Sequence, residues 1–313
     1  FNDNPEFSDE EVFQIARKIN TAIIQSITYN EFIPSLGIEL EPYNAYDKSV
    51  NPQISHLFSV VAFRIGHSQI GKQFVLVNET GINQMVAMED GFFNPSIIQK
   101  HGIDSIINGV VVTKQQANDV YYHNSIRNFL FGEPQRGGLD LCVLDIIRAR
   151  DHGIPDYNSV RKEIGLMPVT GFNEINSDQE VIRRLSQTYR NVDELDPIIG
   201  ILAEEHVKDS TLGETGYYII KEQFERIRDG DRLFYLNDPD LEGLREDISN
   251  TRLSDVIERN TGIDNVPDDV FFVSEIKNSN LRTDNQITFA YIAVFLIVVF
   301  AIYAQRKSSR ISR

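Results

Sequence analysis

The chain has 313 residues, of which 41% are hydrophobic, and its formal net charge is −16 at pH 7. This length and apolar content are enough for one large globular core or two small ones. Such an acidic protein is not expected to bind nucleic acid or an anionic lipid surface, because like charges repel.

The N-terminal segment predicts one long helix that ends before Pro34. Ser8-Asp9-Glu10-Glu11 has the S-x-x-E form of a capping box. Apolar residues keep helical spacing behind it, at Val12, Phe13, Ala16, Ile19, Ile23 and Ile27. Residues 34–50 are more polar and contain proline, glycine and tyrosine, so we expect a loop there.

A second helix is expected to begin at Asn51-Pro52-Gln53 and to be central, because it is apolar nearly all round. Within it, Arg64 and His67 lie three residues apart and share one face. A buried guanidinium needs an anion, because it does not lose its proton. Two interpretations stay open: an aspartate partner beside a hydrogen-bonded core histidine, or haem, whose iron binds a histidine nitrogen and whose propionates bind arginine.

Further helices are predicted over residues 103–108, 120–130, 139–148, 179–187, 214–228 and 252–261, with no run of alternating strands. Asp145 and Arg148 repeat the three-residue spacing, which predicts a second buried arginine beside a carboxylate. Arg150-Asp151-His152-Gly153 then ends that helix, where basic residues interact favourably with the helix dipole.

Residues 287–304, ITFAYIAVFLIVVFAIYA, carry no charge and are long enough for a helix to cross a bilayer core of about 30 Å. We therefore predict a transmembrane helix, the alternative being a buried core helix. The charged residues that follow this segment are all basic. The positive-inside rule therefore places the tail in the cytosol and the rest of the chain on the extracellular or lumenal side. The sequon Asn78-Glu79-Thr80 agrees with that placement, and the sole Cys142 cannot form a disulfide within the chain.

Several ordered blocks resemble the animal haem peroxidases, of the myeloperoxidase and thyroid peroxidase kind. The blocks include FRIGHSQI at 63–70, IRNFLFG at 126–132 and IRARDHGIPDYN at 147–158, and the likeness runs from about Asn4 to Ser274. The resemblance implies a mainly α-helical fold around one haem b, and oxidation of a small-molecule electron donor by hydrogen peroxide. It implies that His67 is the proximal iron ligand and that Arg64 and Arg148 meet the haem propionates. Asp145 falls where the family usually has an asparagine that accepts the other N–H of the proximal histidine.

The same resemblance implies that part of the family's haem site is not in this sequence. In the family, the distal histidine and arginine, a calcium-binding loop and a glutamate that can bond to haem all precede the SDEEVFQIARK helix. We therefore expect the proximal half of the haem site here and no catalytic residue, with calcium possible only in a longer protein. The remaining histidines are expected to be structural or on the surface: His56, His101, His123, His152 and His206.

The predicted organisation is a peroxidase-like domain over 1–275, a juxtamembrane linker over 276–286, a transmembrane helix over 287–304 and a basic cytoplasmic tail over 305–313. Three classes of function fit it. We favour a membrane-anchored haem peroxidase whose distal half lies upstream. The alternatives are a catalytically inactive haem-binding or adhesive membrane protein, and a domain that serves an NADPH oxidase, which predicts a flavin module after the membrane span.

Overall fold

A computed structural model describes residues 7–273, except 79–80, 131, 133–137 and 265. The α-helices are α1 Asp9–Ile27, α2 Ile33–Ser35, α3 His56–Val60, α4 Met88–Gly91, α5 Ser96–His101, α6 Ile103–Val112, α7 Asn124–Asn128, α8 Leu141–Asp151, α9 Tyr157–Glu163, α10 Gln179–Thr188, α11 Pro197–Ala203, α12 Glu214–Asp229, α13 Arg245–Asn250 and α14 Leu253–Asn260. A π-helix, η1, covers Thr28–Phe32, and 3-10 helices cover η2 Ala62–His67, η3 Phe172–Glu174, η4 Val192–Glu194 and η5 Pro239–Leu244. The strands are β1 Gln73–Asn78 and β2 Gly81–Ala87.

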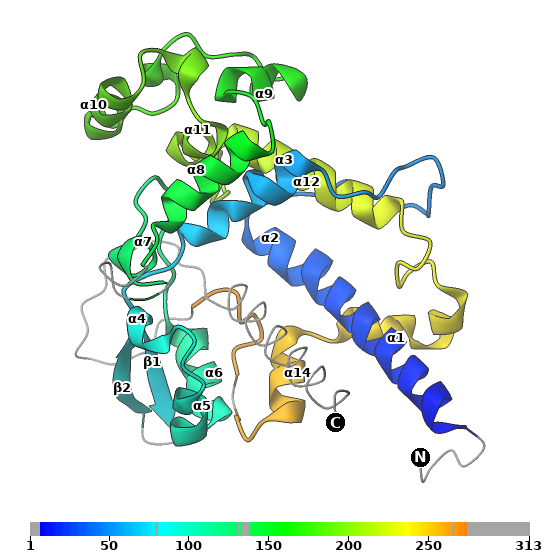
Figure 1. The fold of residues 1–313 in the computed structure, drawn as a ribbon. Coiled ribbons are helices and arrows are strands. Elements are labelled where there is room, and N and C mark those ends of the chain that lie inside the picture. The colour runs from blue at the N-terminus through cyan, green and yellow to red at the C-terminus, as the bar shows by residue number, and fades with distance from the viewer. Residues whose placement is uncertain (1–6, 79–80, 131, 133–137, 265, 274–313) are drawn as a thin grey trace.

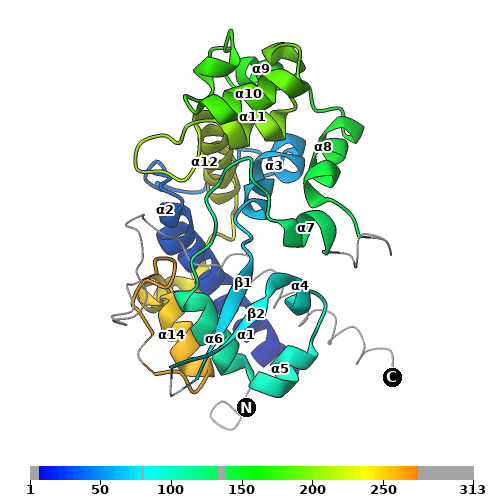
Figure 2. The same cartoon turned by 90° about the vertical axis from the view of Figure 1, so that its left-hand side faces the viewer.

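The elements form two groups, and the mainly helical class is confirmed (Figures 1 and 2). Helices α3 and α8 to α12 lie together at one end of the molecule. The β1–β2 hairpin lies at the other end with α4, α5, α6 and α14. The long helix α1 runs from the hairpin end toward the helical end and leads into α2.

The two strands are a correction to the sequence prediction, which contained no sheet. β1 and β2 pair antiparallel from Gln73↔Ala87 to Asn78↔Gly81, with an irregularity between Leu76 and Val77. A short apolar run such as QFVLVN has no clear period, and so it does not distinguish a strand from a buried helical segment. The pairing becomes favourable because α6 covers the hairpin and buries Leu76 completely.

The capping box of α1 is confirmed, but the predicted end of this helix is wrong. Ser8 accepts a hydrogen bond from the Glu11 backbone N–H, and the Glu11 carboxylate accepts one from the Ser8 N–H at 2.7 Å. The helical path continues through Pro34, because the π-helix η1 precedes it. A proline ring clashes with the carbonyl four residues earlier in a regular α-helix, and the wider π turn changes that register.

The central helix is shorter than predicted and has two parts. Ser55, and not Asn51, is its N-cap, and its hydroxyl accepts from the Phe58 N–H at 3.1 Å. At Val61 the backbone leaves the helical region, with φ −129° and ψ −78°, and the chain continues as the 3-10 helix η2. A 3-10 helix has three residues per turn, so Arg64 and His67 lie directly above one another.

The other predicted helices are present with shifted ends. α6 extends beyond residue 108, whereas α10, α12 and α14 agree with the prediction to within one residue at each end. α7 is much shorter than the predicted 120–130, because the His123 ring accepts from the Ser125 N–H and starts the helix there. The residues directly before His123 are therefore not helical.

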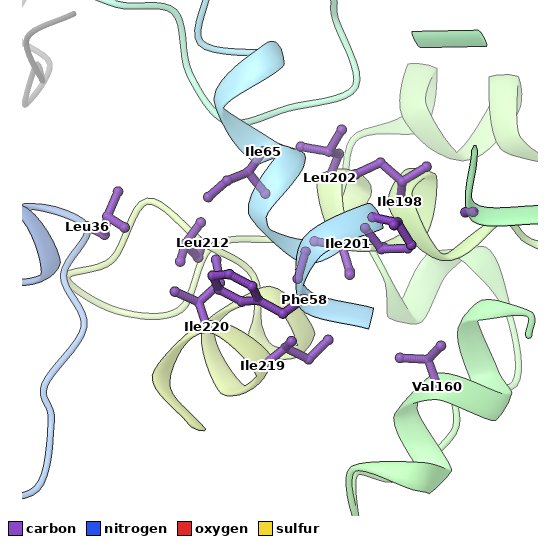
Figure 3. Packing of buried hydrophobic residues seen from close by; sticks show 14 of the residues in the cluster. Leu36, Phe58, Ile65, Val160, Ile198, Ile201, Leu202, Leu212, Ile219 and Ile220 are labelled. Carbon is purple, nitrogen blue, oxygen red and sulfur yellow. The ribbon is translucent and has the colours of Figure 1, made fainter. Parts of the chain in front are cut away.

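The largest apolar core surrounds the central helix, as its all-round apolar character predicted. Phe58 and Ile65 belong to this core together with Ile201 of α11 and Ile219 of α12, all of which are labelled in Figure 3. A second core joins the hairpin, α6 and α14. The packing around α3 and η2 fixes the path of the segment that carries Arg64 and His67.

Several predictions fall on residues that the structure does not describe. The linker 276–286, the proposed transmembrane helix 287–304 and the tail 305–313 lie outside the described part of the chain, as do Glu79 and Thr80 of the sequon. Among the described residues, no helix combines the length and the apolar character that a bilayer crossing requires.

Close packing of α6 on β1 yields a prediction about stability. A methyl group on Gly109 would stand 1.6 Å from the Val75 carbonyl oxygen. Alanine favours a helix over glycine by only about 1 kcal/mol, whereas overpacking against backbone costs about 1–3 kcal/mol or more. Gly109→Ala should therefore lower the free energy of unfolding, measured by urea denaturation.

Gly243→Ala is the matched control, because an added methyl group there would have no atom within 4 Å. It should leave the urea midpoint nearly unchanged. Equal midpoints for both variants would show that α6 and β1 are not in close contact.

Candidate haem-binding site

The candidate site is organised around the carboxylate of Asp145. This residue is completely buried in α8, and three hydrogen bonds from other described residues reach its side chain. His67 Nδ1–H donates to Oδ2 at 2.7 Å, the Tyr122 hydroxyl donates to the same oxygen at 3.1 Å, and Arg64 Nη1 donates to Oδ1 at 3.3 Å. A buried carboxylate is stable only when such partners compensate for its lost hydration.

Local sequence signals hold α8, and thus Asp145, in place. At its start, the Asp140 carboxylate accepts from the Cys142 and Val143 N–H groups. At its end, Gly153 has φ +68° and its N–H donates to the Arg150 carbonyl, so the predicted helix stop is confirmed. Because both ends are fixed, the register of the helix directs Asp145 into the core.

The 3-10 helix η2 delivers two of the three donors. His67 follows Arg64 by one 3-10 turn, and the side chains of Arg64 and His67 are 25% and 28% exposed. The sequence predicted that these residues share a face, and the structure places both of them on Asp145. The open alternatives of an aspartate partner and a haem site are therefore compatible, because the aspartate holds the histidine while leaving its other nitrogen available.

Tyr122 is the member of the site that sequence reasoning missed. It lies in the non-helical segment before α7, is 7% exposed and packs in the main core. Burial, followed by the neighbouring Asp145 charge, raises the pKa of Tyr122 well above its usual value, so its hydroxyl keeps its proton and donates. Only the tertiary structure brings it to Asp145, and the paired tyrosines before the IRNFLFG block give no signal of that contact.

The prediction that Arg148 is a second buried arginine beside a carboxylate is wrong. It is exposed, and Arg64 is the arginine that contacts Asp145. Arg150, which the sequence assigned to the helix dipole, makes a bidentate ion pair with Asp196 at 2.8 and 2.7 Å. Arg148 thus remains on the surface of the helix that carries Asp145.

The other histidines have structural or surface positions. His123 caps α7, and His206 Nε2–H donates to the Asn118 carbonyl at 2.7 Å. His56 and His152 are exposed and touch each other edge to face, with ring centroids 5.4 Å apart. Within the described ranges, no group of three or more His, Cys, Asp or Glu side chains could hold a metal ion.

The side chains around Asp145 fit a haem group. His67 has its Nδ1–H engaged and its ring partly exposed, so Nε2 can act as a ligand. The buried Nε–H of Arg64 has no partner among the described residues. Together with exposed Arg148, this leaves guanidinium donors for carboxylates.

The lone Cys142 lies one turn before Asp145 on α8 and is partly buried. Burial, with smaller contributions from Asp140 and Asp145, raises the pKa of the Cys142 thiol to about 11. A thiol with that pKa stays protonated and unreactive at neutral pH.

Comparison with known proteins identifies relatives of this fold and site. Residues 2–271 match the family model described as animal haem peroxidase. Peroxinectin A from Dictyostelium discoideum is 40% identical over 259 residues, which is 82% of this chain and 48% of that protein. The structure of peroxidase A from Dictyostelium discoideum superposes with a TM-score of 0.81 at 40% identity, covering 85% of this chain and 52% of that one.

A more distant neighbour supports the fold alone. The fatty acid alpha-dioxygenase of Oryza sativa has a TM-score of 0.72 at 20% identity, over 83% of this chain and 51% of its own. In both solved structures and in peroxinectin A, this chain spans about half of the relative's length.

The position of Cys142 gives a pH-dependent prediction. Because an ordinary thiol has a pKa of about 8.5, the thiolate fraction at pH 7 should be roughly two to three powers of ten below that of a free cysteine. Alkylation by iodoacetamide should be slow at pH 7 and should accelerate up to about pH 11. In urea the rate should become that of an ordinary thiol, and rapid labelling of the folded chain at pH 7 would contradict the burial.

Proposed function

The chain belongs to the animal haem peroxidase family, and we propose that it forms the proximal half of the haem site of a peroxidase. The observation that carries the proposal is the contact between His67 Nδ1–H and the buried Asp145 carboxylate. In this arrangement His67 Nε2 is the proximal ligand of a haem b. The substrates are hydrogen peroxide and a small-molecule electron donor.

Haem, when bound, supplies an iron that can accept oxidising equivalents from peroxide. The task of this chain is to hold and tune that group from one side. Asp145 fixes the tautomer of His67 with the proton on Nδ1, which directs the lone pair of Nε2 outward. Because Asp145 also compensates the charge of Arg64, the two residues of η2 are oriented together.

Arg64 and Arg148 are proposed to bind the haem propionates. Arg64 has a buried Nε–H without a partner in the described structure, and Arg148 is exposed on α8. Charge-assisted bonds from guanidinium to carboxylate are stronger than neutral ones and can be bidentate. These two cations therefore favour an anionic, carboxylate-bearing ligand next to His67.

Reaction with peroxide would also need a general acid–base group and electrostatic stabilisation, which the family resemblance assigns to distal residues. We propose that these distal groups come from a part of the protein outside this chain. None of the remaining histidines is proposed as a substitute. His123 and His206 are engaged with backbone groups, His56 and His152 touch each other, and His101 ends α5 in the other group of elements.

The proposed function predicts that haem binding depends on His67. In protein that includes the distal half, His67→Ala should reduce haem affinity by tenfold or more, because it removes the iron ligand. Haem titration followed by absorbance measures this. His101→Ala is the control, since His101 lies at the end of α5 in the other group of elements. Equal affinities for both variants would refute His67 as the ligand.

Asp145 should set the reduction potential of the bound iron. An ionised carboxylate makes the His67 ring a stronger electron donor than a neutral amide does, and a stronger donor favours ferric iron. Asp145→Asn should therefore raise the ferric/ferrous potential, measured by spectroelectrochemistry. A lower potential would show that Asp145 serves mainly as the counter-ion of Arg64.

A further inference from the structure

Two hydrogen bonds compete for one oxygen of Asp145. His67 Nδ1–H donates to Oδ2 at 2.7 Å, and the Tyr122 hydroxyl donates to the same atom at 3.1 Å. Arg64 uses the other oxygen, Oδ1, at 3.3 Å. The carboxylate therefore does not present its full charge to the histidine.

The position of Tyr122 makes this sharing a fixed property of the fold. Tyr122 is 7% exposed and belongs to the main core, and the capping of α7 by His123 directly follows it. Asp145 is completely buried, so water does not compete for Oδ2. In such an environment each added donor strongly changes the basicity of the acceptor.

We infer that Tyr122 is a positioning residue that weakens the hydrogen bond from His67 Nδ1–H to the Asp145 carboxylate. Tyr122 thereby sets how strongly the His67 ring donates electrons to iron. The inference rests on the proposed role of His67 as the haem ligand. The hydroxyl withdraws electron density from Oδ2, so the bond from Nδ1–H to Oδ2 is weaker than an unshared carboxylate would make it. The His67 ring then has less anionic character, and Nε2 is a weaker electron donor.

Removing the hydroxyl should have the opposite effect to neutralising the carboxylate. Tyr122→Phe keeps the aromatic ring and the core packing in place. It leaves the His67 Nδ1–H as the one remaining donor, among the described residues, to Asp145 Oδ2. Asp145→Asn removes the charge from the acceptor. The first change makes His67 a stronger donor and the second makes it a weaker one, so the two variants should move the iron in opposite directions.

The test compares variants of haem-loaded protein that includes the distal half. Tyr122→Phe should lower the ferric/ferrous potential and raise the iron–histidine stretching frequency in the resonance Raman spectrum, whereas Asp145→Asn should do the reverse. Tyr121→Phe is the matched control, because it is the same substitution at the neighbouring, exposed position. It should change neither quantity.

A second measurement does not require haem. In the haem-free protein with labelled histidine, Tyr122→Phe should move the Nδ1 proton of His67 downfield in the NMR spectrum, because its bond to Oδ2 becomes stronger. Tyr121→Phe should leave this resonance in place. If Tyr122→Phe matches Tyr121→Phe in either measurement, or shifts the iron in the direction of Asp145→Asn, the inference is wrong.

The outcomes also separate the two proposals. A wild-type spectrum without an iron–histidine band that depends on His67 overturns the proposed function and the inference together. A band that is present but insensitive to Tyr122→Phe overturns the inference alone. Cooperative thermal unfolding of both tyrosine variants would show that a spectroscopic difference does not arise from misfolding.

Discussion

The buried carboxylate of Asp145 is the constraint on which the site depends. An unpaired charge at a fully buried position would be strongly destabilising, so the fold must bring donors to it. The structure supplies them from two separate segments, Arg64 and His67 from η2 and Tyr122 from the chain before α7. Satisfying this one group therefore fixes the orientation of the histidine ring and the relative positions of three parts of the chain.

The surrounding fold explains why Arg64 and His67 can both reach the Asp145 carboxylate. The change from α3 to the 3-10 helix at Val61 places Arg64 above His67, whereas an α-helix would rotate them apart by about 60°. The apolar core around Phe58 and Ile65 holds that segment against α11 and α12. The site thus combines rigid packing on one side with partly exposed His67 and Arg64 side chains on the other.

Much of the fold could be predicted from local sequence signals. The capping box at Ser8, the glycine stop at Gly153 and the amphipathic helices α10, α12 and α14 are encoded within a few residues each, so sequence reasoning found them. It missed the β1–β2 hairpin, the π turn before Pro34 and the break at Val61. Those features depend on packing against distant elements, which overrides local propensity.

For the site, the sequence by itself determined the residue types and their spacing: a histidine and an arginine three residues apart, and an aspartate in an apolar helix. It could not determine which arginine meets Asp145, because that depends on which face of α8 is buried. The tertiary structure placed Arg64 there, left Arg148 exposed and added Tyr122. These contacts join residues 23 to 81 positions apart, and such partners are set by three-dimensional packing and by the need to satisfy a buried charge.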